Sequence, residues 1–247
     1  MIPKNLFFVW IGGTVPNYCN FCVDNFKRIN PEFKIHFIRY RKDDIENYKD
    51  LKENTEIDSV FKKTMDDVLY QRTRQAIRYK KNKNNKFIVV CFVNVFKINL
   101  LNTFGGIFLD LDTYPVKPFD DKILSLDSFY VKSFHRNNFE YKKRDPDQYF
   151  IGCKKGSNYE EHRDYKTAIE HQEKYFRDNP KFLECRDKFF NCTLRDGERY
   201  TNEDWYIDHY SAGDWLVHKY DKEKKKYVKV NSRCELCKYD NIDTGKT

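Results

Sequence analysis

The sequence predicts an α/β fold with a mixed, mostly parallel central sheet covered by helices, and three observations lead to this prediction. Residues 6–11 form a continuous apolar run that ends at Gly12-Gly13, the pattern of a strand buried on both faces. A helical pattern and a second strand pattern follow, which together make a βαβ opening. Charged segments with apolar residues at spacings of three and four come next, and they indicate helices that cover the sheet.

Helix and strand patterns follow one another through the first half of the chain. A helix is expected over residues 16–28, and the Asn-Pro pair at 30–31 breaks it. Apolar residues alternate in 33–40, which predicts the second strand. Residues 43–83 are charged and amphipathic, so one or two helices are expected there. The first half of 87–103 is rich in β-forming residues, but the length and the apolar spacing of the segment favour a buried helix that ends at Gly105.

Residues 107–112 then have the pattern of a short strand that ends in two carboxylates. Three more elements are expected from apolar periodicity and Pro breaks: strands over 128–134 and 148–153, and a helix over 158–177. Without an internal repeat, a chain of 247 residues is most simply one large domain. We place this domain at residues 1–218 and a basic tail at 219–247.

The positive charge of the chain is concentrated in this tail. The formal net charge is +8, and residues 219–238 alone contain 8 basic and 3 acidic residues. A basic nucleic-acid-binding or zinc-binding module is therefore one alternative. It ranks low because the excess is confined to one Lys-rich segment without a recognition motif, and no nucleic-acid partner is expected.

The cysteines and the apolar stretches bear on location and metal content. Two Cys-x-x-Cys pairs, at 19–22 and 234–237, lie more than 200 residues apart, which fits no standard zinc module. The longest apolar stretch, 87–96, has about half the length of a bilayer-spanning helix. The first residues also lack a secretory-signal pattern. We therefore expect a cytoplasmic protein with no membrane span and with unoxidised thiols.

The Asp-x-Asp at the end of the predicted strand 107–112 is the sharpest chemical feature. On a strand, side chains two residues apart point to the same face, so Asp110 and Asp112 would present two carboxylates to one spot. Two such charges repel unless a cation lies between them. Hard oxygen ligands favour magnesium, calcium or manganese, and such ions are commonly held by one or two carboxylates together with substrate phosphates.

Three motifs in order resemble a known group of enzymes. They are Val-Trp-Ile-Gly-Gly at 9–13, Gly-Gly at 105–106 followed by the strand and Asp-x-Asp, and His-Tyr-Ser-Ala-Gly-Asp-Trp at 209–215. Together they are similar to the Asp-x-Asp glycosyltransferases of glycosyltransferase family 32, which includes yeast outer-chain mannosyltransferases and bacterial capsule enzymes. They also resemble the glucosyltransferase domain of the large clostridial toxins. The resemblance implies a GT-A fold, a nucleotide-sugar donor and a manganese or magnesium ion.

The resemblance also implies roles for single residues. Trp10 would lie against the nucleotide base, and Trp215 would belong to a loop that closes over the donor. Asp110 would contact the ribose and the metal shell, and Asp112 would bind the ion directly. His209 would bind the metal or the diphosphate. Asp110 and Asp112 are thus the candidate catalytic residues, with His209 as a third metal-ligand candidate.

The helix before Gly105 departs from the family pattern. Asn94 and Lys97 stand where the family usually has Asp and Arg, and Gln148 stands where it tends to have Asn. Lysine is a point charge without the planar fork of arginine, so the geometry of sugar recognition should differ. These three residues and Gly106 complete the expected donor-binding set. The departures leave open a degenerate transferase that binds a nucleotide sugar without turning it over.

The expected function is transfer of a sugar from a UDP-sugar, favoured over a GDP-sugar, to an acceptor hydroxyl. Charge builds up on the leaving diphosphate, which a metal held by the two aspartates would neutralise. Retention of configuration is implied by the resemblance alone. The acceptor could be a glycan, a lipid or a protein side chain.

Overall fold

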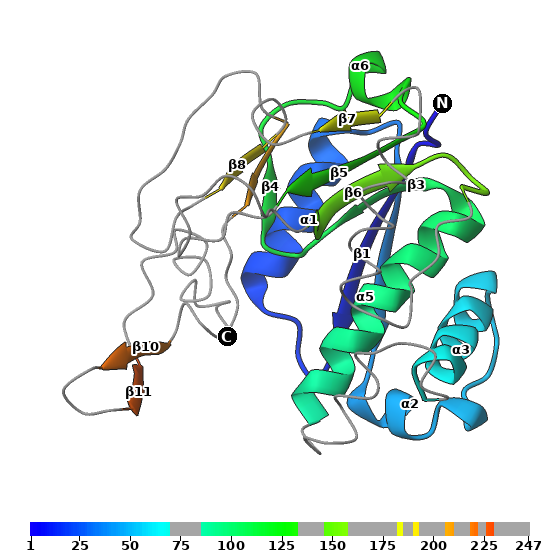
Figure 1. Ribbon diagram of the computed structural model, residues 1–247, viewed down its shortest axis with the longest axis vertical. Helices are drawn as coiled ribbons and strands as arrows, with labels where there is room; N and C mark the ends of the chain where they lie inside the picture. Colours follow the sequence, from blue (N-terminus) through cyan, green and yellow to red (C-terminus); the bar gives the residue numbers. More distant parts are fainter. Residues whose placement is uncertain are drawn as a thin grey trace, which may run out of the picture. The chain divides into compact units, whose positions relative to one another are not determined.

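The computed structural model describes residues 1–69, 85–132, 146–157, 182–184, 190–192, 206–209, 218–221 and 226–229. The chain forms two compact units, and Figure 1 labels most of their helices and strands. Unit 1 consists of Met1–Gly13, Glu32–Leu109 and Asp120–Cys185. Unit 2 consists of Thr14–Pro31, Asp110–Phe119 and Arg186–Thr247.

Unit 1 is built on a sheet with the strand order β2-β1-β3-β6-β5-β7. The strands are β1 (Asn5–Ile11), β2 (Lys34–Tyr40), β3 (Gly106–Leu109), β5 (Ser128–Lys132), β6 (Pro146–Cys153) and β7 (Phe182–Glu184). β1 pairs in parallel with β2 and β3, and β5 pairs in parallel with β7. β6 alone runs against its neighbours β3 and β5. The described strands therefore confirm the predicted mixed, mostly parallel sheet.

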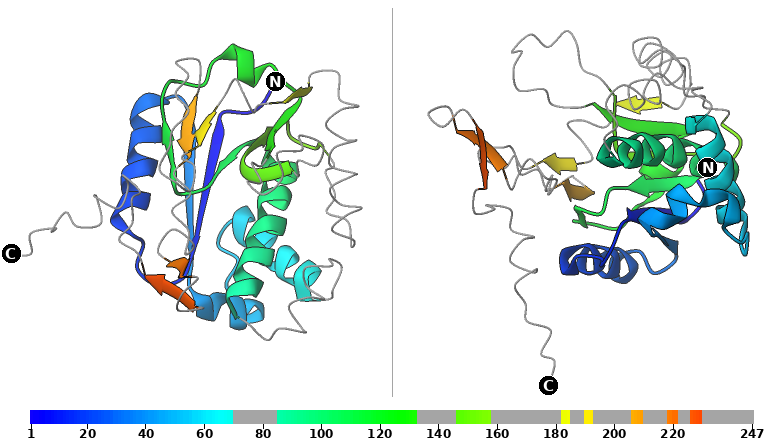
Figure 2. Two further views of the ribbon diagram at one scale, coloured as in Figure 1. Left: turned by 60° about the vertical axis from the view of Figure 1, so that its left-hand side comes forward. Right: turned by 90° about the horizontal axis from the view of Figure 1, so that it is seen from below.

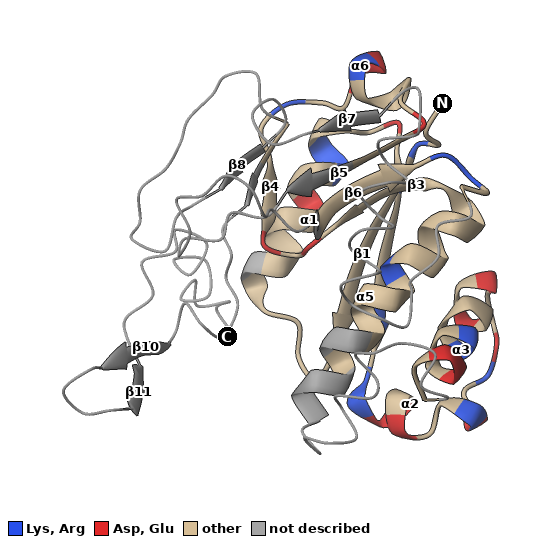
Figure 3. Cartoon of the chain, viewed as in Figure 1, with Lys and Arg blue, Asp and Glu red and all other residues tan. Residues whose placement is uncertain are grey.

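The central strands are apolar because both of their faces are covered. β1 and β3 contain no charged residue, whereas charged side chains are common on the helices α2 (Lys42–Glu46) and α3 (Glu56–Leu69) (Figure 3). Leu6, Phe7 and Phe8 are all fully buried in β1. Consecutive strand residues point to opposite faces, so burial of all three confirms the expectation of a strand covered on both sides.

Helices α3 and α5 (Asn85–Phe104) cover one face of this sheet and lie side by side in both views of Figure 2. The 3-10 turn η1 (Tyr48–Asp50) precedes α3. Phe61 of α3 packs against Phe92 and Phe96 of α5, with ring centroids 4.7 and 5.9 Å away. The same core contains Phe7 and Phe108 from β1 and β3. Full burial of a phenylalanine contributes about 1.5–3 kcal/mol, so this aromatic cluster anchors both helices to the sheet.

Helix α5 ends where the sequence predicts. The Gly105 N–H donates to the Leu101 carbonyl at 2.8 Å, and Gly105 has φ +65°, the left-handed conformation that closes many helices. Gly106 follows with φ +127° and opens β3. A Cβ at Gly106 would lie 2.6 Å from the Asn5 carbonyl oxygen of β1. The Gly-Gly pair therefore ends the helix and lets the next strand approach β1.

Further along, the short helix α6 (Asp121–Leu124) is capped by Asp120.

Unit 2 contains α1 (Asn17–Ile29) and a sheet with the order β4-β9-β8. The strands are β4 (Thr113–Pro115), β8 (Phe190–Cys192) and β9 (Ile207–His209), and a separate antiparallel pair is formed by β10 (His218–Asp221) and β11 (Lys226–Lys229). Cys19 and Cys22 are both buried in α1, and the second Cys-x-x-Cys pair lies outside the described residues.

The structure corrects the sequence prediction at the Asp-x-Asp. The strand predicted over 107–112 ends at Leu109, and a turn follows it. The short strands β4, β7, β8 and β9 were not predicted, because three residues are too few to show a period. The helix predicted over 158–177 lies outside the described residues. Within the described ranges, no helix is both long and apolar enough to cross a bilayer.

Candidate functional site

The Asp-x-Asp lies in a closed β-turn instead of on a strand. Thr113 closes the turn onto the Asp110 carbonyl oxygen, to which its backbone N–H donates at 3.2 Å and its hydroxyl at 2.6 Å. Asp110 is therefore the first residue of the turn, and Asp112 is the third. The argument from strand alternation was wrong here, because aspartate as the first residue favours a tight turn over a continued strand.

The turn still gathers both carboxylates in four consecutive residues. The ends of a β-turn lie within about 7 Å of each other, and Asp110 and Asp112 are both half-buried. Two carboxylates of one turn are a hard-oxygen donor set that suits magnesium or manganese when substrate phosphates and water supply the other ligands. No group of three or more His, Cys, Asp or Glu side chains suited to a metal ion occurs among the described residues.

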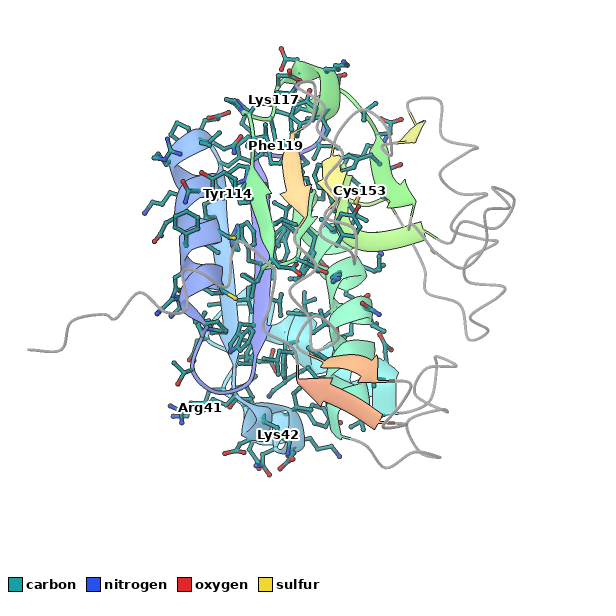
Figure 4. All side chains as sticks on the ribbon, turned by 90° about the vertical axis from the view of Figure 1, so that its left-hand side faces the viewer. Arg41, Lys42, Tyr114, Lys117, Phe119 and Cys153 are labelled. Carbon is teal, nitrogen blue, oxygen red and sulfur yellow. The ribbon has the colours of Figure 1, made fainter. Side chains whose placement is uncertain are left out.

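Strand β4, which follows the turn, is held by helix α1. The Tyr114 ring stacks on Phe21 with centroids 5.7 Å apart, and its hydroxyl donates to the Asn25 side-chain oxygen at 3.4 Å. Figure 4 labels Tyr114, with Lys117 and Phe119 further along the same segment. The aromatic contact and the hydrogen bond fix Tyr114, which lies two positions after Asp112.

A buried asparagine fixes the far end of the same segment. Asn30 is fully buried, and its side-chain oxygen accepts a hydrogen bond from the Phe119 backbone N–H at 2.8 Å. The Phe119 ring packs against Tyr206 at 5.8 Å, and the Lys117 ammonium lies 4.5 Å above the Tyr206 ring. The Val116 N–H donates to the Tyr206 carbonyl at 2.8 Å. The segment that carries the Asp-x-Asp is thus held on both sides within unit 2.

Strand pairing brings His209 to this segment. Thr113 of β4 is the antiparallel partner of His209 in β9, although His209 lies 97 residues after Asp112. Directly opposed residues of an antiparallel pair have Cα atoms about 4.5–5.5 Å apart. On the other side of β9, Cys192 of β8 is the partner of His209. The structure therefore places the His209 backbone next to the residue that follows Asp112, and the metal role of His209 stays a prediction.

Trp10 lies in unit 1, near the carboxyl end of β1. It is half-buried, and its indole N–H donates to the Gly13 carbonyl at 3.0 Å. This bond uses the single hydrogen-bond donor of the indole, so the ring faces are what Trp10 can offer to a ligand. The Gly12 N–H in turn donates to the Tyr40 carbonyl at 3.0 Å, which holds the Gly-Gly turn to β2.

The three predicted donor residues around α5 have distinct surroundings. Asn94 is half-buried, whereas Lys97 is only 4% exposed and places its ammonium 4.9 Å above the Phe108 ring of β3. A cation over an aromatic face is stabilised by the ring quadrupole. Gly106 packs against the Asn5 backbone, as described above, which gives this glycine a structural reason independent of any ligand.

Two predicted donor residues are described only in part or not at all. Gln148 belongs to β6, of which the structure describes the backbone at this position, and Trp215 lies outside the described residues.

Sequence reasoning also missed two residues of the site. Thr113 closes the turn, and its signal was the turn-forming Asp-Leu-Asp-Thr pattern. Asn30 was taken only as part of a helix-breaking pair.

A family model for the glycosyltransferase sugar-binding region containing a DXD motif matches residues 16–130. The match includes the Asp110–Thr113 turn, Asn94, Lys97 and Gly106. No curated protein matches the chain in sequence.

Several solved structures are similar to the chain at low identity. The PaToxG glycosyltransferase is 16% identical over 63% of this chain and 56% of its own, with a TM-score of 0.40. A glycosyltransferase involved in glycosylation of the major capsid of PBCV-1 is 10% identical over 86% of this chain and 95% of its own, also at 0.40. The catalytic domain of alpha-toxin from Clostridium novyi is 12% identical over 63% and 56%, at 0.33.

This chain thus spans just over half the length of the two toxin proteins. Structural similarities with identities and TM-scores this low carry no information about the donor or the acceptor. What the comparisons establish is a similarity of residues 16–130 to the glycosyltransferase sugar-binding region containing a DXD motif.

Proposed function

We propose that this chain is a metal-dependent glycosyltransferase that moves a sugar from a nucleotide diphosphate donor to an acceptor hydroxyl, with retention of configuration. The observation that carries the proposal is the match of the sugar-binding DXD family model across a turn that gathers Asp110 and Asp112. The assignment to glycosyltransferase family 32 and to a GT-A type of donor site belongs to the same proposal.

Asp112 would hold a manganese or magnesium ion directly, and Asp110 would contact the ribose and the metal shell. His209, paired in register with Thr113, is the candidate for a third protein ligand or for the diphosphate. When bound, such an ion neutralises the negative charge that develops on the leaving diphosphate. The task of the chain is to hold its carboxylates in fixed positions, and the hydrogen-bonded turn suits that task.

Trp10 would stack on the base of the donor. Because its N–H already donates to Gly13, the contact would use the ring face, and stacking on an aromatic face does not distinguish one base from another. Selection of UDP over GDP, which we favour, would therefore depend on groups that meet the edge of the base.

Asn94, Lys97, Gly106 and Gln148 would line the sugar and diphosphate part of the donor site. The Lys97 charge would add to the stabilisation of the diphosphate. Trp215 would close over the bound donor and exclude water, which suppresses hydrolysis. We place the catalytic domain in residues 1–218, in the cytoplasm, and leave the acceptor as a glycan, lipid or protein hydroxyl.

The decisive experiment is a thermal-shift panel of UDP, GDP and their common sugar conjugates, each with manganese and again with EDTA. A ligand at 100 times its Kd stabilises the folded state by about 2.7 kcal/mol, which moves the melting temperature measurably. We expect a manganese-dependent shift with UDP and its conjugates. No shift with any nucleotide would contradict the proposal.

A second candidate is a degenerate transferase that binds the donor without turnover. The replacement of the expected Asp and Arg by Asn94 and Lys97 favours it. Incubation of the protein with manganese, each UDP-sugar and a set of glycan, lipid and protein acceptors separates the two candidates. Release of UDP from one UDP-sugar supports the enzyme, whereas a manganese-dependent shift without any release supports the binding protein.

A further inference from the structure

We propose that Thr113 is a positioning residue for Asp110 and Asp112, because its side-chain hydroxyl locks the turn that sets the separation of the two carboxylates. The inference rests on the proposed function, since positioning has a purpose only if the two aspartates bind a metal and a nucleotide. Thr113 itself would touch neither ligand.

The contacts of Thr113 distinguish its hydroxyl from an ordinary surface hydroxyl. It donates to the Asp110 carbonyl at 2.6 Å, and the same oxygen accepts the Thr113 backbone N–H at 3.2 Å. Thr113 has no exposed surface. Removal of the hydroxyl would therefore take away the shorter of the two bonds from Thr113 to this carbonyl and keep the longer, 3.2 Å bond from the backbone N–H.

The hydrogen bond from Thr113 influences the positions of the two carboxylates through the backbone geometry of the turn. Leu111 and Asp112 are the two central residues between the joined ends of the turn, so the backbone dihedral angles that aim the Asp112 side chain depend on how tightly Thr113 closes on Asp110. Magnesium-like ions require ligand oxygens in a narrow range of positions. A misplacement of about 1 Å can cost about 100-fold in function.

The partner strand and helix α1 make Thr113 the fixed end of the turn. Its backbone pairs with His209 of β9, and its neighbour Tyr114 is held by Phe21 and Asn25 of α1. Because β4 is held in place by these contacts, the hydrogen bond from the Thr113 hydroxyl fixes the Asp110 carbonyl relative to β4. Loss of the hydroxyl should therefore move Asp110 and leave β4 in place.

The test compares Thr113→Val with Thr113→Ser by calorimetric titration of UDP, once with manganese and once with EDTA. Valine keeps the shape of threonine and loses the donor, whereas serine keeps the donor. We expect Thr113→Val to weaken manganese-dependent UDP binding about tenfold and to weaken binding in EDTA clearly less, since only the ribose contact of Asp110 remains without the metal. Thr113→Ser should remain within about twofold of the wild type in both. If Thr113→Val does not fold, Thr113→Cys, with its weaker S–H donor, carries the same expectation.

Thr103→Val is the matched control, because the Thr103 hydroxyl donates to the Asn99 carbonyl at 2.8 Å within α5. It removes the same kind of bond and should leave both affinities unchanged. Full manganese-dependent affinity in Thr113→Val, or an equal loss with and without manganese, would overturn the positioning role while the proposed function stands. Absence of manganese-dependent UDP binding by the wild type would instead overturn the proposed function, and this inference with it.

Discussion

Thr113 and His209 face each other across the antiparallel strands β4 and β9, although 96 residues separate them in the sequence. Thr113 also closes the turn that contains Asp110 and Asp112. One residue therefore joins the Asp-x-Asp to the strand that carries the predicted third metal ligand. This pairing gives the backbone of His209 a defined place beside the turn.

Asp112→Asn should abolish metal-dependent chemistry and preserve the fold. An amide lacks the negative charge that holds a divalent cation, so manganese-dependent UDP-sugar turnover should fall by about 100-fold or more. Turnover and the urea-unfolding free energy are measured on the same preparation. Asp24→Asn, at an exposed aspartate of α1, is the control and should behave as the wild type. Unchanged turnover in Asp112→Asn would remove the metal assignment.

Gly106→Ala should destabilise unit 1 strongly. The new Cβ would lie 2.6 Å from the Asn5 carbonyl oxygen, and φ +127° is strained for any residue with a Cβ. A cost of about 1–3 kcal/mol is expected from the backbone conformation alone, and the contact with Asn5 adds to it. Urea unfolding gives the free energy. Gly13→Ala is the control, since nothing lies within 4 Å of a Cβ there, and an equal loss in both variants would contradict the packing argument.

Trp10→Ala should weaken UDP binding more than Trp10→Phe does. Base stacking on an aromatic side chain contributes about 1–3 kcal/mol, and phenylalanine keeps a ring face while it loses the donor to the Gly13 carbonyl. Titration of UDP in the presence of manganese measures both affinities. If Trp10→Ala binds UDP as tightly as the wild type, Trp10 does not contact the base.

His36 should make the stability of unit 1 depend on pH. Burial, and next the positive charge of Lys34, lower the pKa of His36, whose ring stacks on Phe7 at 4.7 Å and lies 3.3 Å from the Asn5 side-chain oxygen. The unfolded chain therefore binds this proton at a higher pH than the folded chain does. The free energy of unfolding should be at its full value above about pH 6.5 and fall as the pH drops through that value.

Urea unfolding at pH 8 and pH 5.5 measures this dependence. His36→Phe keeps the stacked ring and removes the titrating group, so it should lose less stability than the wild type between the two pH values. An identical loss in the wild type and in His36→Phe would assign the pH dependence to other groups.

The pattern of apolar residues along the chain was sufficient to predict the strands β1 and β2 and the helices α3 and α5 of unit 1. The unbroken apolar run before Gly12-Gly13 became β1, the length and apolar spacing of 87–103 indicated α5, and Gly105 ends α5 as its sequence position indicated. The parallel pairing of β1 with β2 followed from the βαβ order. Such features depend on neighbours in sequence, which is why the sequence contains them.

The candidate site residues were proposed from the sequence, but the local structure around Asp110 and Asp112 was not predicted. Strand alternation predicted a common face for Asp110 and Asp112, whereas the structure has a turn closed by Thr113. The turn-forming residues after Leu109 end β3 there. The strand β4 has only three residues, which are too few to show an alternating pattern in the sequence.

The sequence alone therefore determined most strands of the sheet of unit 1 and the position at which α5 ends. Only the tertiary structure decided that Thr113 pairs with His209 and that Asn30 holds the Phe119 backbone. The physical reason is that these contacts join residues 89 to 96 positions apart. Their partners are selected by strand register and by the need to satisfy buried polar groups, and neither leaves a repeating signal along the chain.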